Sequence, residues 1–126
     1  MPSAMPIYSM TMAPSRGEVW WIDFDPSVGA EIEKLRPAVV VSVRSVGRLP
    51  LRIVVPITDW KSQYASFPWM TYLSPTAGNG FTKECAADAF QVKSVGQPRF
   101  KTHLGTLTPR EMEDIAAAIA LCVGYV

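Results

Sequence analysis

Proline and glycine interrupt this sequence so often that most of it can form only short elements of secondary structure. The 126 residues include eleven prolines and eight glycines, spread along the whole length. Both residue types favour turns and weaken the interior of helices and strands. The sequence therefore predicts many short β-strands, and its hydrophobic content of 48% is enough for a packed core. This length suits a single domain.

Six segments have the aromatic and β-branched composition of strands and are bounded by turn residues. The predicted strands are 17–24, 36–43, 51–57, 67–73, 83–92 and 100–104. Pro37 stands at the start of a strand, where a missing N–H is tolerated, whereas Pro56 predicts a sheet edge or a bulge. Residues 58–64 predict a short helical turn, and 74–80 predict a loop.

The last segment predicts the one long helix. Thr108 is a good N-cap, Pro109 suits the first helical position, and Glu111 completes a capping box. Gly124 predicts the C-terminal end. Apolar residues at steps of three and four predict one buried stripe, made of Met112, Ile115, Ala116, Ile119 and Val123. Short strands followed by one C-terminal helix predict a mainly β fold, a small barrel with the helix packed on it.

The net charge of +1 is not that of an obvious nucleic-acid binder, but the charge is unevenly distributed. Residues 34–61 hold six basic residues and one acidic residue, while residues 17–33 hold five acidic and no basic ones. This pattern is compatible with one basic groove for phosphates, but charge alone favours a solvated charged surface.

The number and spacing of the cysteines and the histidine limit the kinds of metal site and disulfide that this sequence can form. The two cysteines are far apart and there is one histidine, so we expect reduced thiols in a cytoplasmic protein and no metal site. No apolar run reaches the length of a membrane span. Residues 1–15 lack the charged start and apolar stretch of a secretory signal, and we expect a loose extension (1–15) before one domain (16–126).

No serine-hydrolase elbow, P-loop or zinc-protease motif is present, but several other motifs follow one another in order. They are RGEVWWIDFDP (16–26), G-x-E (29–31), LRPAVVVS (35–42), VPIT (55–58), DAFQVK (88–93) and LGTLT (104–108). Together they resemble the MazF/PemK family of toxins. The fifth motif departs from the family's D-Q-(V/I)-(K/R) pattern by an inserted Ala-Phe.

The resemblance implies a fold and an activity. The fold would be a small SH3-like β-barrel of the CcdB/PemK type. The protein would be the toxin of a bacterial toxin–antitoxin system, an endoribonuclease that cleaves single-stranded RNA without a metal or other cofactor. The 2′-hydroxyl would attack the adjacent phosphorus, leaving a 2′,3′-cyclic phosphate and a 5′-hydroxyl. The resemblance also implies a cytoplasmic homodimer, silenced by an antitoxin with an acidic, disordered C-terminal tail.

The resemblance also assigns candidate site residues. Arg36 and Thr58 match the family's catalytic Arg–Thr pair, and a guanidinium fork with a hydroxyl suits a phosphoryl group. Glu31 matches a loop glutamate that either accepts the 2′-hydroxyl proton or orients Arg36, with Glu33 as an alternative. The RNA-binding candidates are Lys34, Trp60, Lys61, Lys83, Gln91 and Lys93. Lys61, Lys83 and Lys93 are also common as ordinary surface residues, and Trp60 could equally pack in the core.

Two other functions remain open at this stage. The same barrel could carry a CcdB-like toxin that binds DNA gyrase without catalysis. That family's gyrase contact resembles a C-terminal Trp-Gly-Ile, whereas this chain ends Gly124-Tyr125-Val126. The third alternative is a non-toxic SH3-like module that binds nucleic acid or a peptide.

Overall fold

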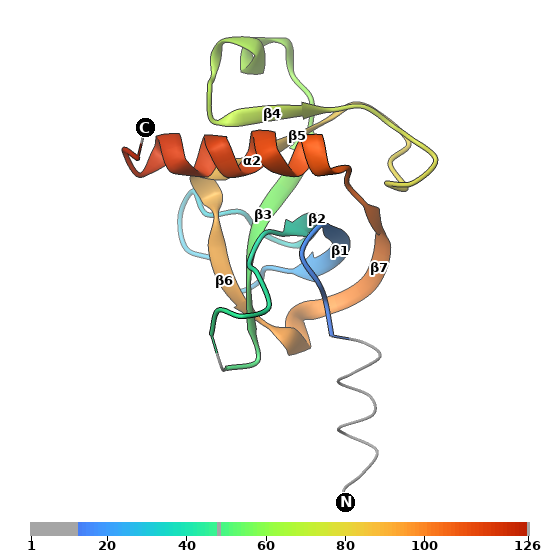
Figure 1. Ribbon diagram of the computed structural model, residues 1–126, viewed down its shortest axis with the longest axis vertical. Helices are drawn as coiled ribbons and strands as arrows, with labels where there is room; N and C mark the ends of the chain where they lie inside the picture. Colours follow the sequence, from blue (N-terminus) through green and yellow to red (C-terminus); the bar gives the residue numbers. More distant parts are fainter. Residues whose placement is uncertain (1–12, 48, 126) are drawn as a thin grey trace, which may run out of the picture.

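The computed structural model describes residues 13–47 and 49–125. Within these residues it contains one antiparallel sheet, three short 3₁₀ helices and one α-helix (Figure 1). The strands are β1 (Glu18–Asp23), β2 (Leu35–Val40), β3 (Leu51–Asp59), β4 (Met70–Leu73), β5 (Cys85–Asp88), β6 (Lys93–Gly96) and β7 (Phe100–Thr106). The helices are η1 (Ser62–Ser66), η2 (Ala89–Gln91), η3 (Gln97–Arg99) and α2 (Pro109–Cys122).

The nine-residue strand β3 is the centre of the sheet, whose order is β4-β5-β3-β2-β1-β7. Along one side β3 pairs with β2, and along the other it pairs first with β6 and then with β5. The path stays open between β4 and β7, but the sheet bends around its core with α2 across one side (Figure 1). The predicted mainly β fold with a C-terminal helix is confirmed, and the curved sheet is compatible with a small barrel.

The expectation that Pro56 marks a sheet edge or a bulge was wrong. This proline is fully buried and pairs with Ala38 in the middle of the sheet, not at an edge. Pro56 lies between the residues of β3 that pair with β6, which end at Val54, and those that pair with β5, which begin at Ile57. A missing N–H is tolerated at this position because the partner strand changes there.

The predicted strand 83–92 is in fact interrupted. Its middle forms η2, because the side chain of Asp88 accepts a hydrogen bond from the N–H of Phe90 and caps that turn. The chain then returns to pair with the beginning of β3 as β6, rather than continuing along its end. The helical turn expected over 58–64 lies later, in η1, because Thr58 and Asp59 still belong to β3.

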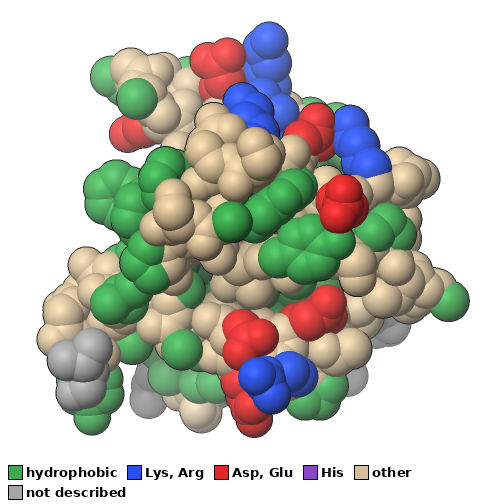
Figure 2. Space-filling model, turned by 90° about the horizontal axis from the view of Figure 1, so that it is seen from above, with side chains coloured by type: hydrophobic (Ala, Val, Ile, Leu, Met, Phe, Trp, Pro, Cys, Tyr) green, Lys and Arg blue, Asp and Glu red, His purple; other side chains and the backbone are tan. Residues whose placement is uncertain are grey.

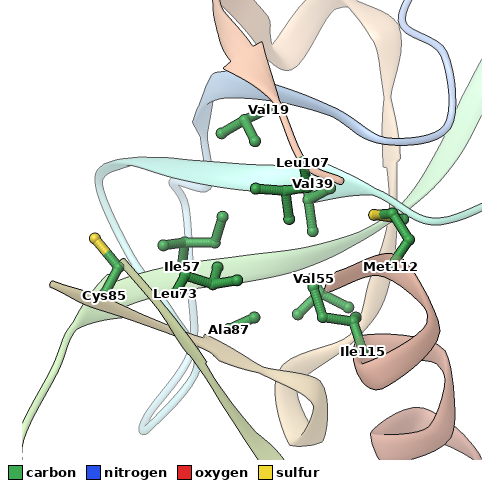
Figure 3. Close-up of a cluster of buried hydrophobic side chains, with 10 residues drawn as sticks. All are labelled: Val19, Val39, Val55, Ile57, Leu73, Cys85, Ala87, Leu107, Met112 and Ile115. Carbon is green, nitrogen blue, oxygen red and sulfur yellow. The ribbon is translucent and has the colours of Figure 1, made fainter. Parts of the chain in front are cut away.

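The core consists of two apolar clusters, and strand alternation assigns neighbouring residues to different ones. Val19, Val39 and Val55 belong to the cluster beneath α2, whereas Trp20 and Ala38 belong to the other. Figure 3 shows Met112 and Ile115 of α2 directed toward the first cluster. The same alternation separates the adjacent tryptophans, because Trp20 is buried and Trp21 is half-exposed.

Helix α2 begins as the sequence predicts, with both hydrogen bonds of the capping box between Thr108 and Glu111. Its buried face is narrower than the predicted stripe. Ala118 joins Met112 and Ile115 on that face, and Ile119 packs partly against the core. Ala116 and Val123 were placed wrongly and are exposed: Ala116 lies on the flank of the helix, and Val123 follows its last turn.

The predicted extension over residues 1–15 falls largely outside the described residues. Residues 13–15 are described, and Pro14 is buried, with its carbonyl accepting a hydrogen bond from Arg52 Nε at 2.8 Å. Among the described residues, no helix is long and apolar enough to cross a membrane.

The packing of α2 can be tested by shortening one buried side chain. Ile115→Ala is expected to lower the free energy of unfolding by about 2–5 kcal/mol, because it leaves a cavity between α2 and β3. Leu121→Ala, at a helix position that is 40% exposed, is the matched control and should cost less. The measurement is urea denaturation followed by circular dichroism, and equal losses in both variants would contradict the assigned buried face.

Candidate active site

A cleft of about 540 Å³ lies where β2 begins and β3 ends. Three candidates from the sequence, Arg36, Thr58 and Lys83, line it together with Trp21 of β1. The apolar part of the lining includes Pro37, Ile57, Phe81, Cys85 and Leu104. The cleft therefore combines charged groups at its rim with an apolar wall, which is the usual composition of a ligand site.

The antiparallel strands β2 and β3 bring Arg36 and Thr58 to one cleft. The β2–β3 pairing ends with Ala38 and Pro56, and Arg36 and Thr58 each lie two residues beyond that pair, where both line the cleft. Both residues are half-buried, neither sealed in the core nor fully solvated. Arg36 Nε donates to the carbonyl of Glu33 at 3.2 Å, which holds the guanidinium near the strand's start.

The opposite wall of the cleft is the loop between β4 and β5, and Asn79 organises it. This side chain is fully buried, and its Oδ1 accepts from the backbone N–H groups of Thr76 and Phe81 at 3.1 and 2.9 Å. Its Nδ2 donates to the carbonyl of Ser74 at 2.8 Å. Because these three bonds tie the buried amide to Ser74, Thr76 and Phe81, they fix the conformation of the loop that leads to Lys83.

Two glycines let this loop approach β7 closely. A Cβ on Gly105 would lie 2.5 Å from the backbone carbon of Asn79, and a Cβ on Gly80 would lie 2.5 Å from the carbonyl oxygen of Leu104. Gly80 also has a backbone φ of +74°, which residues other than glycine rarely adopt. The cleft wall therefore depends on glycine at both positions.

A carboxylate that sequence analysis did not select lies in the cleft. Asp59 follows Thr58 on β3, and its Oδ2 accepts a hydrogen bond from Lys83 Nζ at 3.1 Å. Both side chains are more than 60% exposed, so the pair contributes little to stability. Of the described residues that line the cleft, Asp59 is the only one with a carboxylate. Its place after Thr58 was a signal that the motif comparison did not use.

Glu31 lies outside this cleft. Its Oε1 accepts from the backbone N–H of Val28 at 2.9 Å and closes a turn in the β1–β2 loop. Gln91 Oε1 accepts from the N–H of Ile32 at 2.7 Å and ties the same loop to η2. Glu31, Gln91 and Lys93 line a separate cavity of about 380 Å³, so the structure divides the predicted residues between two places.

The remaining candidates lie around these two places. Lys34 is exposed, with a φ of 67°, and its N–H donates to Asp25 Oδ1. Trp60 is half-exposed and packs edge-on against Tyr64 and Tyr72, with Lys61 exposed beside it. Neither Trp60 nor Lys61 lines the cleft itself.

Comparison with known proteins gives the family. A model of PemK-like, MazF-like toxins of type II toxin–antitoxin systems matches residues 15–123. This chain belongs to that family. It is 32% identical over 112 residues to endoribonuclease MazF9 of Mycobacterium tuberculosis (strain ATCC 25618 / H37Rv), covering 84% of this chain and 92% of the relative. It is 34% identical over 113 residues to the endoribonuclease toxin MazF of Escherichia coli (strain K12), covering 88% and 95%.

Solved structures share the fold of this PemK/MazF-like chain. MazF from Deinococcus radiodurans has a TM-score of 0.73 at 21% identity, covering 88% of this chain and 96% of its own. A mycobacterial endoribonuclease in complex with its cognate antitoxin has a TM-score of 0.70 at 22% identity, covering 90% and 98%. The resemblance inferred from the motifs is confirmed.

In this family member, burial shifts the pKa of two further side chains, Cys85 and Asp88. Burial raises the pKa of the Cys85 thiol, and the nearby Asp59 carboxylate raises it further, so this cysteine is a neutral wall residue rather than a thiolate nucleophile. Burial also raises the pKa of Asp88, against the hydrogen bonds from the N–H groups of Phe90 and Gln91 that lower it. No group of three or more potential metal ligands is clustered in residues 13–47 and 49–125.

The role of Asn79 in shaping the cleft can be tested. Asn79→Ala removes three side-chain hydrogen bonds in a buried site and should lower the free energy of unfolding by about 1–3 kcal/mol. Ser66→Ala, which removes a hydroxyl from the exposed 3₁₀ helix η1, is the control and should have little effect. Thermal unfolding and hydrogen exchange of residues 74–84 are the measurements. Unchanged exchange in that loop would contradict this role.

Proposed function

We propose that this chain is a metal-independent endoribonuclease that cleaves single-stranded RNA by attack of a 2′-hydroxyl on the adjacent phosphorus. One observation carries the proposal: Arg36 of β2 and Thr58 of the neighbouring strand β3 line the same open cleft. The relatives of this chain in Mycobacterium tuberculosis and Escherichia coli are named endoribonucleases, which supports the same activity here. As a family member, the chain would act as the toxin of a bacterial toxin–antitoxin pair.

The chemistry requires charge stabilisation, in-line geometry and a base. The 2′-oxygen forms a bond to phosphorus while the bond from phosphorus to the 5′-oxygen breaks, giving a 2′,3′-cyclic phosphate and a 5′-hydroxyl. Arg36 would donate two parallel hydrogen bonds to the phosphoryl oxygens, on which negative charge accumulates. Thr58 would donate a third from the neighbouring strand. A base removes the 2′-hydroxyl proton, and the leaving oxygen takes up a proton.

Asp59 is the carboxylate that the structure supports as that base. It lies in the cleft, next in sequence to Thr58, and its exposed ion pair with Lys83 is weak enough to open when RNA enters. Glu31 would then orient Arg36 rather than accept the 2′-hydroxyl proton. Its bond to the Val28 N–H shapes the loop that contains Glu33, whose carbonyl accepts from Arg36. Glu31 thus acts as a positioning residue for Arg36.

The proposed RNA path extends from the cleft on two sides. Lys83 lies within the cleft, while Lys61 and the half-exposed ring of Trp60 lie just past the end of β3. Bases of single strands stack on such rings, and lysines contact the backbone phosphates. Lys34, Gln91 and Lys93 would contact the strand on the side of the β1–β2 loop. The nucleotide sequence recognised depends on contacts that these residues would make with individual bases.

The proposed assembly is a homodimer in the bacterial cytoplasm, with an antitoxin as its regulatory partner. A mycobacterial relative and a MazF of Deinococcus radiodurans have been solved with their antitoxins, which supports this partner class. An antitoxin tail that is acidic and partly apolar would match the cationic and aromatic groups around the cleft.

The catalytic pair is tested with purified protein, a long single-stranded RNA and excess chelator. Arg36→Ala should lower the cleavage rate by about 10²–10³-fold, since it removes a donor to the developing charge. Thr58→Val, which removes the hydroxyl at nearly constant volume, should lower it by about 10–100-fold. Sequencing the cut ends should show 5′-hydroxyls. Folded wild-type protein that leaves diverse RNAs intact would overturn the proposal, and a gyrase supercoiling assay would then test the CcdB-like alternative.

The two carboxylates are distinguished by the size of the rate loss. Asp59→Asn should lower the cleavage rate by about 10²–10⁴-fold, because it removes the proposed base. Glu31→Gln should cost less, because it affects only the loop that holds Arg36. Lys83→Met breaks the ion pair but retains the Asp59 carboxylate, so it controls for loss of the pair. An Asp59→Asn variant that cleaves RNA at the wild-type rate would exclude Asp59 as the base.

A further inference from the structure

Three arginines surround a second cavity, of about 340 Å³, at the far end of β2 and β3 from the cleft. Arg16 precedes β1, Arg44 lies in the β2–β3 loop, and Arg52 belongs to β3. This loop lies at the end of the molecule away from α2, near the point where the chain enters β1 (Figure 1). The six residues of β2 separate the two sites by roughly 20 Å.

Main-chain carbonyls hold two of these guanidiniums in place. Arg16 Nη1 donates to the carbonyl of Val41, and Arg52 donates from Nε to Pro14 and from Nη1 to Leu51. When the side-chain amide of Gln97 is oriented with its oxygen toward Arg52, that oxygen accepts from both Nη atoms at 3.1 Å. Because carbonyls orient these arginines without neutralising them, the cavity retains its positive charge.

No carboxylate of the described residues lines this cavity or forms a salt bridge with its arginines. The lining contains neither aspartate nor glutamate, and the two salt bridges of the described chain, Lys83–Asp59 and Arg110–Asp114, lie elsewhere. The nearest acid in sequence, Glu18, accepts instead from the Ser15 N–H and from Trp20 Nε1. The face shown in Figure 2 differs from the arginine cavity, because acidic and basic side chains lie close to one another there, with apolar side chains between them.

Two features favour an anion with several oxygens in this cavity. Three like charges around one space repel each other, and a bound anion removes that cost. Ser42, also in the lining, accepts at Oγ from the Ile53 N–H at 3.1 Å, so its own proton is free to donate to a ligand. Guanidinium forks from different directions suit the tetrahedral oxygens of a phosphate better than the coplanar pair of a carboxylate.

We infer that this arginine cavity, formed by Arg16, Arg44 and Arg52, is a phosphate-binding site separate from the cleft. Its phosphate belongs either to the backbone of a bound RNA, at a distance from the scissile bond, or to a small phosphorylated molecule. The assignment to RNA rests on the proposed function, whereas the phosphate chemistry does not. Arg52 forms the base of the site, and Arg16 and Arg44, which are exposed, meet the ligand.

The first experiment measures RNA binding without cleavage. A mixed-sequence 2′-O-methyl oligoribonucleotide lacks the attacking hydroxyl, and its affinity is titrated against salt concentration. Arg16→Ala and Arg44→Ala should each weaken binding and reduce the slope of log K against log[salt] by about 0.7, the value for one lost phosphate contact on a single strand. Arg110→Ala, which removes an exposed charge on α2, is the control and should leave the slope unchanged. On oligonucleotides too short to span roughly 20 Å, the arginine variants should bind as wild type does.

The second experiment distinguishes the source of the phosphate. Inorganic phosphate and pyrophosphate are titrated into wild-type protein and into the Arg16→Ala/Arg44→Ala double variant by calorimetry. Binding of pyrophosphate to wild type only, with RNA affinity equal in both proteins, assigns the site to a small phosphorylated ligand. An RNA effect supports the backbone assignment.

Three outcomes would overturn the inference. The first is a double variant that matches wild type in RNA affinity, salt slope and pyrophosphate binding, with thermal unfolding showing both proteins folded. The second is poly-glutamate binding through the same arginines as tightly as RNA of equal charge. The third is an Arg110→Ala variant that loses as much affinity as the cavity variants. RNA cleavage is measured separately, so failure of the proposed nuclease activity is distinguished from failure of this site.

Discussion

The antiparallel pairing of β2 with β3 is the interaction on which the rest of this molecule depends. It places Val39 and Val55 in the core beneath α2, and it leads into the segments from which Arg36 and Thr58 line the cleft. A slip of one residue would exchange the faces that pack in the two apolar clusters, so close packing on both faces fixes the register near the catalytic candidates as well. The stability of the core and the geometry of the cleft thus share one cause.

Strand β3 can serve both ends of the sheet because it changes partners along its length. Its beginning pairs with β6 and its end with β5, and Pro56 occupies the change. The end of β3 then delivers Thr58 and Asp59 to the cleft, while its beginning delivers Arg52 to the arginine cavity. The cleft and the arginine cavity therefore lie at opposite ends of the same strand. Side chains on a strand hold their geometry better than side chains on a loop.

Side chains hold two loops in place, one at the cleft and one at the separate cavity beside Glu31. Asn79 fixes the β4–β5 loop from inside, and Gln91 holds the β1–β2 loop through the Ile32 N–H. The inserted Ala-Phe of the fifth motif falls in η2, directly before Gln91. These two residues form the 3₁₀ turn together with Gln91, whose side chain contacts the loop at Ile32.

The sequence by itself determined the strand-rich fold, the capped start of α2 at Thr108, the family, and the choice of Arg36 and Thr58, because these follow from local propensity and ordered motifs. Only the tertiary structure separated Glu31 from the cleft, brought Asp59 and Lys83 into it, and gathered Arg16, Arg44 and Arg52 around one cavity. The physical reason is that these groups meet across different strands and loops. Their proximity is set by strand register and by buried loop contacts, which no local pattern encodes.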